Sequence, residues 1–366
     1  MLSKNIIVLY HDCCTDGFGA AYAHYLSMTT RLPVFSCTRI DTVMRDEHKY
    51  KLRFVDHPQE YNLHYMPVNY SWIKNRSPIS LLENIFEEYS PESYRETTVV
   101  ILDFSFDVAT FELLKKTFER VVMIDHHDTA LRKYEMHGGK ISYGDNWMII
   151  LDKNHSGAYL SYKHFEQSLS NSNTNSVPDS KIPHVFKLIE DRDLWKFKYE
   201  DTDSFHVGMQ LVARDLDLWK KKLENDEEYQ SIITNGSCVV KYRNILCNEN
   251  IKQQTQKVDI CYEIGGIKIH KQARCVNTLP TLYSNTGSLL CSGIDVDLAL
   301  MWSINEAGNV MCGLRSGAKY NTLPIAEFFG GGGHEFASGF TISVDEFQKH
   351  VKMCDKLINK EVSLIL

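Results

Sequence analysis

Residues 121–128 read VVMIDHHD, and the interpretation of the whole chain starts from this stretch. Its first four residues are apolar and mostly β-branched, which predicts a short buried strand. The strand runs into an acid, two imidazoles and a second acid without a turn residue between them. In open α/β sheets, binding sites form at the carboxyl ends of the strands. Successive residues at a strand end point in different directions, so one histidine can hold a metal while its neighbour faces a substrate.

The same pattern occurs twice more in the chain. Residues 6–10 (IIVLY) run into His11, and residues 98–102 (TVVIL) run into Asp103. A single His-His pair is more often part of a turn with satisfied histidines, but three apolar strands ending in His or Asp predict one shared cluster. Carboxylates and imidazoles without a Cys-x-x-Cys pair suit Mn²⁺ or Mg²⁺ better than a structural zinc.

Helical segments separate these strands. Residues 18–26 are rich in small side chains, residues 81–89 have a helical pattern, and Phe111, Leu114 and Phe118 form one apolar face at i, i+3 and i+7. Alternation of strand and helix predicts an α/β fold with a doubly wound parallel sheet and right-handed crossovers.

The bulk properties of the chain limit its class. At 366 residues it is too long for one ordinary core, and 43% hydrophobic with 24% charged residues is typical of a soluble globular protein. A net charge of −7 argues against a protein that coats long nucleic acid through its overall field. The ten cysteines show no disulfide or zinc-finger spacing. No apolar run approaches the length that a membrane span needs. We therefore expect a cytoplasmic protein without a membrane partner.

Pattern and composition divide the chain into three parts. Residues 1–200 contain the three strands with polar ends. Residues 201–262 are highly charged and helical in pattern to about residue 260, which predicts a connector between domains. Residues 263–366 form a second, smaller α/β domain, with strands expected at 266–270, 298–304 and 309–314.

The second domain ends in two further predicted elements. A short helix after Thr322 stops at the glycine run 330–333. Ser343 with Glu346 forms a capping box for a last helix. The apolar stripe of this helix comprises Phe347, Val351, Cys354 and Ile358.

The glycine run is followed directly by His334. Four consecutive glycines inside a folded domain are costly in chain entropy. A linker would explain them, but linkers rarely lie between a capped helix and a strand. A backbone that approaches an anion closely explains both the glycines and the neighbouring histidine.

Two more segments bear on the polar cluster. Residues 190–193 read EDRD after an apolar helical segment. Such a group is usually a surface ion pair, and a fourth contribution to the cluster is the competing interpretation. His155 is expected to be a helix-entry residue, with Ser156 as the N-cap.

Taken in order, these motifs resemble the DHH phosphoesterase superfamily, in the branch that carries a C-terminal DHHA1 domain. Asp125-His126-His127 matches the motif that names the family. Segments 11–17, Asp103 and 191–193 look like its other conserved blocks. Arg315-Ser316 and the glycine run with His334 look like the substrate-binding motif of DHHA1.

The resemblance implies an Mn²⁺-dependent phosphoesterase. Members include single-strand exonucleases, oligoribonuclease-like enzymes, cyclic-dinucleotide phosphodiesterases and inorganic pyrophosphatases. The expected activity is two-metal hydrolysis of short single-stranded oligonucleotides or dinucleotides to mononucleotides, in a cleft between the domains, without binding of long duplexes. Two alternatives stay open: a pyrophosphatase or exopolyphosphatase, and a non-catalytic nucleotide sensor with a degenerate metal site. The oligomeric state is open, and a homodimer is compatible with the sequence.

The resemblance also assigns roles to residues. Two Mn²⁺ ions, with Mg²⁺ as the alternative, would be held by His11, Cys14, Asp16, Asp103, His126 and Asp191. Asp103 is the expected bridging ligand, and Asp193 is the alternative to Asp191. The catalytic residues would be Asp103, His126, His127 and Asp125. In this set His127 would contact the scissile phosphate or the leaving oxygen. Asp125 and Asp128 would orient the imidazoles. The substrate would be held by His127, Arg315, Ser316, Gly331, Gly332, Gly333 and His334.

One position departs from the family pattern. The first block usually offers two acids separated by one residue, and Cys14 stands here where the first acid would be. Three interpretations follow: Cys14 ligates as a thiolate, Asp12 substitutes for the acid, or one metal site is weakened. A thiolate ligand favours a softer ion.

Overall fold

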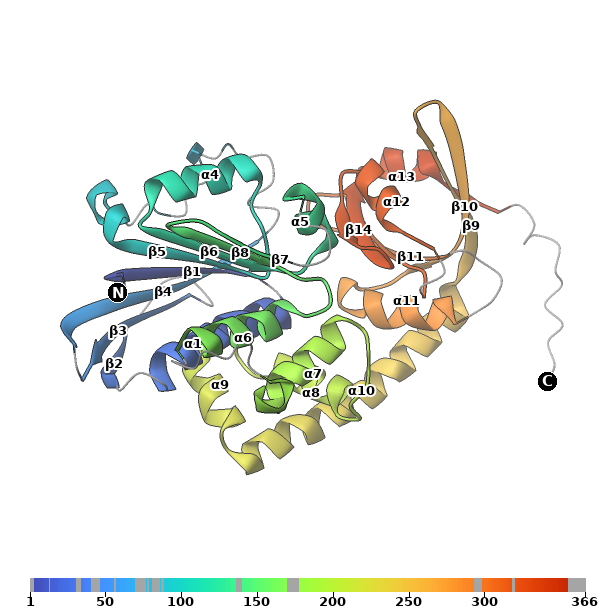
Figure 1. The fold of residues 1–366 in the computed structure, drawn as a ribbon. Helices are drawn as coiled ribbons and strands as arrows, with labels where there is room; N and C mark the ends of the chain where they lie inside the picture. The colour runs from blue at the N-terminus through green and yellow to red at the C-terminus, as the bar shows by residue number, and fades with distance from the viewer. Residues whose placement is uncertain are drawn as a thin grey trace. The chain divides into compact units, whose positions relative to one another are not determined.

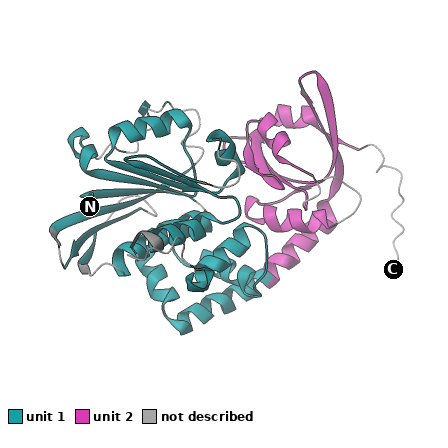
Figure 2. Ribbon diagram, in the orientation of Figure 1, with its two compact units in different colours: residues 1–240 teal, residues 241–366 magenta. Residues whose placement is uncertain are grey.

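The structure is a computed structural model of the chain. It describes residues 3–12, 14–30, 34–40, 47–55, 57–69, 77, 79–80, 86, 89–135, 140–169, 178–292, 298–317 and 320–354. The chain divides into two compact units, unit 1 (Met1–Val240) and unit 2 (Lys241–Leu366) (Figure 2). The division falls inside the helix α10 (Asp226–Gln254), whereas the sequence places boundaries after residues 200 and 262. The boundary between the units lies within one regular helix, so no change in residue composition indicates it.

An eight-stranded sheet forms the centre of unit 1, in the order β2-β3-β4-β1-β5-β6-β8-β7 (Figure 1). Its strands are β1 (Asn5–His11), β2 (Val34–Ile40), β3 (His48–Phe54), β4 (His57–Val68), β5 (Thr97–Leu102), β6 (Arg120–Asp125), β7 (Lys140–Tyr143) and β8 (Trp147–Leu151). Strands β4, β1, β5, β6 and β8 are parallel, which confirms the predicted centre of the sheet. Strands β2, β3 and β7 pair antiparallel at the edges, so the expectation of a wholly parallel sheet is wrong there. Connections as short as those of β3–β4 and β7–β8 can join only antiparallel strands.

Helices cover both faces of this sheet (Figure 1). The helices described in unit 1 are α1 (Thr15–Thr30), α4 (Val108–Thr117), α5 (Asp128–Lys133), α6 (Gly157–Leu169), α7 (His184–Asp193), α8 (Thr202–Gln210), α9 (Leu216–Leu223) and the first part of α10, with 3₁₀ turns at Pro91–Glu96 and Asp179–Lys181. Phe111 and Leu114 of α4 are buried in the core on one face, and Tyr22 of α1 and Tyr159 of α6 belong to the core on the other. This two-sided covering is the doubly wound arrangement that the sequence predicts.

The three strands with polar ends finish at the same edge of the sheet. Tyr10 of β1 pairs with Leu102 of β5, and Leu102 pairs with Ile124 of β6. The next residue in each strand is therefore His11, Asp103 or Asp125. Because the strands are parallel and in register, these three polar residues leave the sheet side by side.

Unit 2 contains a seven-stranded sheet in the order β13-β14-β12-β11-β10-β9-β15. Its strands are β9 (Gln256–Ile264), β10 (Ile267–Asn277), β11 (Leu298–Ile304), β12 (Val310–Arg315), β13 (Gly332–His334), β14 (Ala337–Ile342) and β15 (Val351–Met353). Its helices, besides the end of α10, are α11 (Tyr283–Cys291), α12 (Leu323–Phe328) and α13 (Val344–His350), with a 3₁₀ turn at Pro280–Leu282. Among the described strands of unit 2, only β10 and β11 pair in parallel. The three strands predicted for the smaller domain are confirmed.

Two predicted helices differ from the structure. The helical pattern expected to continue to about residue 260 ends with α10, and β9 follows it. The last helix ends at His350, because Val351 and Met353 pair with β9 as the edge strand β15. The Ser343 cap is confirmed, since its hydroxyl accepts a hydrogen bond from the amide of Glu346. Of the helix expected at 81–89, only Phe86 and Tyr89 are among the described residues, and Ile358 lies outside them.

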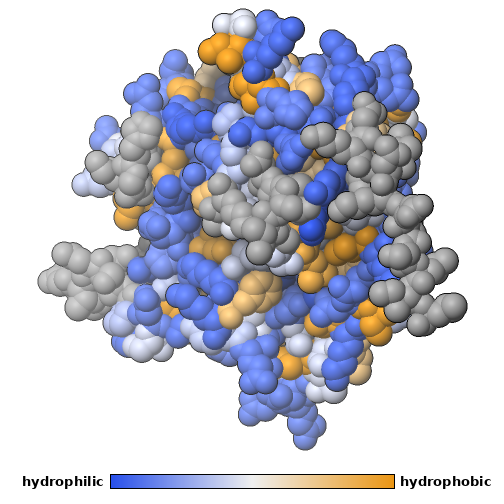
Figure 3. All heavy atoms as spheres, turned by 90° about the vertical axis from the view of Figure 1, so that its right-hand side faces the viewer, coloured by the Kyte–Doolittle hydropathy of each residue, from blue (hydrophilic) through white to orange (hydrophobic). Residues whose placement is uncertain are grey.

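One face of the molecule is mixed in hydropathy. On the face drawn in Figure 3, hydrophilic side chains predominate and apolar ones gather in small, separated groups. Among the residues that the structure describes, no helix combines the length and the apolarity that crossing a bilayer requires.

Candidate metal centre

Asp103 lies at the centre of a cluster of acids and histidines in unit 1. Its Oδ2 is 3.3 Å from Nδ1 of His11, and its Oδ1 is 3.2 Å from Nε2 of His126. Its side chain is 1% exposed, and its backbone has a φ of 62°. This left-handed conformation is uncommon for residues other than glycine but is tolerated by aspartate. The turn directs the carboxylate so that its two oxygens meet two different histidines.

Asp16 joins the cluster from the first turn of α1. Its Oδ2 lies 3.6 Å from Nε2 of His126. Its carboxylate is held from behind, because the amides of Gly157 and Ala158 donate hydrogen bonds of 2.6 and 2.9 Å to its two oxygens. These amides are the first two of α6, where unpaired N–H groups and the helix dipole stabilise an anion.

Asp193 is the aspartate of α7 that reaches the cluster. Its Oδ2 is 3.5 Å from Nε2 of His126. Asp191 does not reach it, although the sequence names Asp191 first as the ligand. Successive residues of a helix are rotated by about 100°, so residues two apart point to nearly opposite sides and only one of the two can face the cluster.

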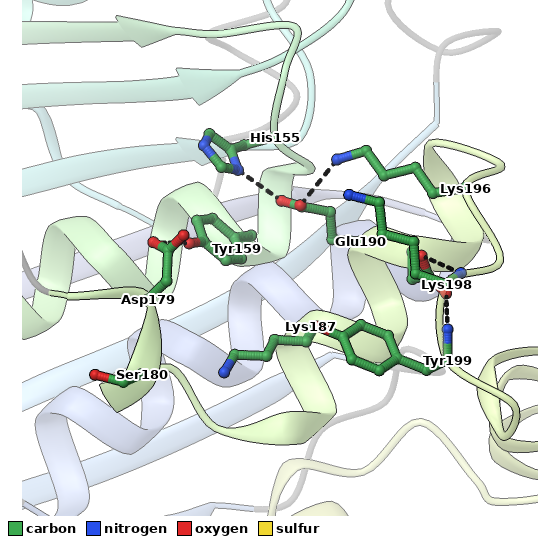
Figure 4. A pocket seen from close by; sticks show the side chains of 10 residues that line it. His155, Tyr159, Asp179, Ser180, Lys187, Glu190, Lys196, Lys198 and Tyr199 are labelled. Carbon is green, nitrogen blue, oxygen red and sulfur yellow. Dashed lines mark hydrogen bonds and ion pairs between the residues drawn. The ribbon is translucent and has the colours of Figure 1, made fainter.

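Asp191 instead anchors the chain that follows α7. Its oxygens accept hydrogen bonds from the amides of Lys198 (2.9 Å) and Tyr199 (3.1 Å) and from the hydroxyl of Thr202. It lines a cavity of about 270 Å³ (Figure 4). Figure 4 also shows Glu190 between His155 and Lys196, to which it is hydrogen-bonded. The carboxylates of Glu190 and Asp191 thus have hydrogen-bond partners within the protein.

The DHH segment supplies an oriented histidine. Asp125 is fully buried, and its Oδ1 accepts hydrogen bonds from the amides of His126 and His127 and from Nδ1 of His127, the last at 2.7 Å. This arrangement fixes the His127 ring and places its Nε2 at the opposite end. Asp128 begins α5 and lies 3.9 Å from Nζ of Lys153.

Cys14 completes a second group of potential ligands around Asp103. The Cys14 sulfur and one ligand atom each from His11 and Asp103 lie within 4.8 Å of one another. The same limit holds for Asp16, Asp103 and His126, and for Asp103, Asp125 and His127. Asp103 is common to all three groups. Asp12 belongs to none of these groups, and its Oδ1 lies 3.5 Å from Nη1 of Arg214.

The electrostatics of the cluster favour a bound cation. Burial, together with Asp103 and Asp193, raises the pKa of Asp16 well above its usual range. Burial also raises the pKa of Asp193. Although burial opposes ionisation of Asp103, the imidazoles of His11 and His126 hold its pKa well below the usual value. Burial lowers and the surrounding aspartates raise the pKa of His126, with a net upward shift. Protonation therefore reduces the repulsion between the neighbouring carboxylates. A bound divalent cation would reduce the same repulsion.

Two buried oxygens point to such an ion. Oδ1 of Asp103 and Oδ2 of Asp193 form no hydrogen bond of good geometry with the described residues, and both lie at ion-pair distance, 3.2 and 3.5 Å, from the same atom, Nε2 of His126. A buried carboxylate oxygen without a donor is costly unless a cation meets it. The donors are carboxylates, imidazoles and one thiol, which fit a divalent ion. Unit 1 thus contains buried clusters of acids and histidines that are suited to hold metal.

The predicted substrate residues of unit 2 lie in two parts of its sheet. Arg315 ends β12, and its guanidinium donates to the hydroxyl of Ser284 (2.8 Å) and to the carbonyl of Leu314 (2.7 Å). Burial lowers the pKa of Arg315 to about 10. Ser316 is fully buried, and its hydroxyl has no hydrogen-bond partner among the described residues.

The glycine run has a local structural reason. A Cβ at Gly331 would lie 2.0 Å from the carbonyl oxygen of Gly339, and one at Gly333 would lie 2.7 Å from that of Ala337. Gly333 also has a φ of 134°. The close approach of Gly331, and of Gly333 in β13, to strand β14 therefore requires glycine at both positions. Binding of an anion by Gly331, Gly332, Gly333 and His334 stays a prediction.

Gly157→Ala is expected to weaken metal binding without removing a ligand. A Cβ there would meet Oδ1 of Asp103 at 2.7 Å and Cβ of Asp103 at 2.8 Å. Overpacking of this kind costs roughly 1–3 kcal/mol, and the first group to move is the shared carboxylate. We expect the Kd for Mn²⁺, measured by calorimetry, to rise by roughly tenfold or more.

Gly144→Ala is the matched control, since its Cβ would clash with the indole of Trp147 beside the edge strand β7, away from the ligands of the cluster. It should lower the melting temperature and leave the Kd for Mn²⁺ unchanged. Equal Mn²⁺ affinities in the two variants would contradict the placement of Asp103.

The sequence gives no sign of some of these contacts. The amides of Gly157 and Ala158 hold Asp16 through the backbone, so no side-chain type identifies them. The N-cap at Ser156 is the one nearby signal, and it is confirmed by the 3.3 Å hydrogen bond from the amide of Tyr159. His155 lies at the entry of α6 as expected, with Nδ1 2.8 Å from Glu190.

Comparison with known proteins gives distant similarities. No family model matches the sequence. An uncharacterized protein of Acanthamoeba polyphaga mimivirus is 25% identical over 340 residues, which make up 92% of this chain and 67% of the viral protein. A solved structure, the pGpG-specific phosphodiesterase PggH of Vibrio cholerae, is similar with a TM-score of 0.42 and 11% identity, over 94% of this chain and 96% of that one.

Proposed function

We propose that this chain is a metal-dependent phosphodiesterase that hydrolyses short single-stranded oligonucleotides or dinucleotides to mononucleotides. The observation that supports this most directly is the position of Asp103, whose two oxygens meet His11 and His126 and which is shared by three groups of ligand atoms. The order of the DHH-like motifs along the chain supports the reaction class.

Asp16, Asp103, His126 and Asp193 would hold one ion, and His11, Cys14 and Asp103 a second. Divalent ions bound here, Mn²⁺ or Mg²⁺ in the first place, supply a Lewis acid for the phosphate and lower the pKa of water. The protein holds these ligands rigidly, because the amides of α6 fix Asp16 and the backbone turn at position 103 fixes Asp103. A site fixed in this way loses little free energy to reorganisation during the reaction.

His127 is the group that we assign to the leaving oxygen. Asp125 accepts the Nδ1 hydrogen bond of His127, so Nε2 is the atom that can pass a proton to substrate. Burial lowers the pKa of His127, but Asp125 reverses this and shifts the pKa upward. A ring oriented in this way can act as a general acid towards the leaving oxygen.

The net charge of the chain favours short substrates. A net charge of −7 disfavours binding of long nucleic acid through the overall field, whereas a short substrate needs only a few local cationic groups. Arg315 and His334 in unit 2 are our proposed contacts to a terminal phosphate or sugar.

A panel of labelled substrates tests the proposal. The full chain is incubated with linear oligonucleotides of graded length, linear and cyclic dinucleotides, and pyrophosphate, each with Mn²⁺, Mg²⁺ or chelator. We expect mononucleotides from the shortest substrates, and no product with chelator. If pyrophosphate were the only substrate hydrolysed, the chain would be a pyrophosphatase and the proposal would be wrong. Tight nucleotide binding without turnover in any metal would replace it by a nucleotide sensor.

A further inference from the structure

Cys14 contributes a sulfur to the cluster at a position fixed by the backbone. It precedes α1, and its carbonyl accepts a hydrogen bond of 3.2 Å from the amide of Phe18, which fixes it at the start of the helix. Its side chain is half-buried. Its sulfur lies within 4.8 Å of ligand atoms of both His11 and Asp103.

Asp103 connects this group to a second one of different chemistry. Oδ2 of Asp103 faces His11, which belongs to the group of Cys14, and Oδ1 faces His126. Oδ1 is buried beside Nε2 of His126, at 3.2 Å, and ligand atoms of Asp103, His126 and Asp16 lie within 4.8 Å of one another, so the carboxylate can hold a cation on that side as well. One side thus offers sulfur, imidazole and carboxylate. The other offers imidazole with the carboxylates of Asp16, Asp103 and Asp193.

These two donor sets prefer different ions. Oxygen-rich sites suit Mn²⁺ and Mg²⁺, whereas a thiolate with an imidazole suits Zn²⁺, Co²⁺ or Fe²⁺. Both groups share Asp103, so the ions would be neighbours.

We propose that the two metal positions are unlike: the position of His11, Cys14 and Asp103 takes a thiophilic ion such as Zn²⁺, Co²⁺ or Fe²⁺ through the Cys14 thiolate, and the position of Asp16, Asp103, His126 and Asp193 takes Mn²⁺ or Mg²⁺. This inference rests on the metal centre of the proposed function and specifies its ions. It makes the chain a mixed-metal protein.

Cobalt absorption tests the sulfur ligand without any substrate. The metal-free full chain is titrated with Co²⁺, and the near-ultraviolet charge-transfer band between thiolate and cobalt is recorded. We expect the band in the natural sequence and its loss in Cys14→Ser and Cys14→Asp. Cys37→Ser, which removes an exposed thiol of β2, should keep the full band.

A competition experiment tests the second position. With Co²⁺ in the first position, we expect Mn²⁺ to bind with a stoichiometry of one, detected by electron paramagnetic resonance, and not to displace the band. In Cys14→Asp we expect two Mn²⁺ ions per chain. Circular dichroism of each variant shows that a lost band does not reflect unfolding.

The outcomes separate this inference from the proposed function. Persistence of the band in Cys14→Ser, or Co²⁺ binding by the natural sequence without a band, would overturn the inference and leave hydrolysis untouched. A Cys14-dependent band in a chain that hydrolyses no phosphodiester would support the inference and end the proposed function. Failure to bind Co²⁺ at all would overturn the inference.

Discussion

Asp103→Asn is expected to abolish metal-dependent hydrolysis of a dinucleotide, lowering kcat by roughly 10³-fold or more. Asp103 is common to the three groups of ligand atoms within unit 1, and its two oxygens meet His11 and His126 on different sides. Asparagine keeps the shape and tolerates the left-handed backbone, but it carries no charge and turns one oxygen into an N–H donor. A loss of several kcal/mol of transition-state stabilisation is the usual scale for a metal centre, and about 4 kcal/mol corresponds to 10³-fold.

Asp107→Asn is the matched control for this substitution. Asp107 caps α4 four residues further along the same segment, and it accepts a hydrogen bond of 2.9 Å from the amide of Thr110. Asparagine is as good an N-cap as aspartate, so both the fold and kcat should be retained. Calorimetry should show that Asp103→Asn loses bound Mn²⁺ while Asp107→Asn does not. Full activity of Asp103→Asn would remove the basis of the proposed function.

The edge of the sheet where the cluster forms could be predicted from sequence for a simple reason. Apolar runs that end in His11, Asp103 and Asp125 give both the strands and the chemistry at their ends. Parallel pairing then leaves little freedom, because the register of Tyr10, Leu102 and Ile124 brings the three ends together. Local composition and one rule of sheet topology are sufficient for this part of the fold.

The remaining contacts depend on packing that no local pattern records. The choice between Asp191 and Asp193 depends on how α7 is rotated about its axis, which is set by core residues such as Phe186 and Ile189. The support of Asp16 comes from amides 141 and 142 residues away. The spacing of Phe347, Val351 and Cys354 fits a helix, but pairing with β9 turns the last part into a strand. In each case a tertiary contact overrides or supplements the local signal.

The two aspartates of α7 should respond in opposite ways to the same substitution. Asp193→Asn is expected to lose Mn²⁺ binding and hydrolysis while the metal-free chain stays as stable as before or becomes more stable. Burial and the neighbouring charge of Asp103 raise the pKa of Asp193, although His126, His127 and Arg192 act in the opposite direction. Removing that buried charge lowers its desolvation cost in the absence of metal and deletes a ligand in its presence.

Asp191→Asn should instead lower the free energy of unfolding by roughly 2–4 kcal/mol and leave the Kd for Mn²⁺ nearly unchanged. The Asp191 carboxylate is 2% exposed and accepts hydrogen bonds from two amides and the hydroxyl of Thr202. In asparagine, the side-chain NH₂ group would face one of these donors, and that hydrogen bond would be lost. Urea unfolding of the metal-free chains, followed by Mn²⁺ titration of each, measures both quantities. Loss of Mn²⁺ binding in Asp191→Asn with retention in Asp193→Asn would reverse the assignment, because only the aspartate that faces His126 can share an ion with Asp103.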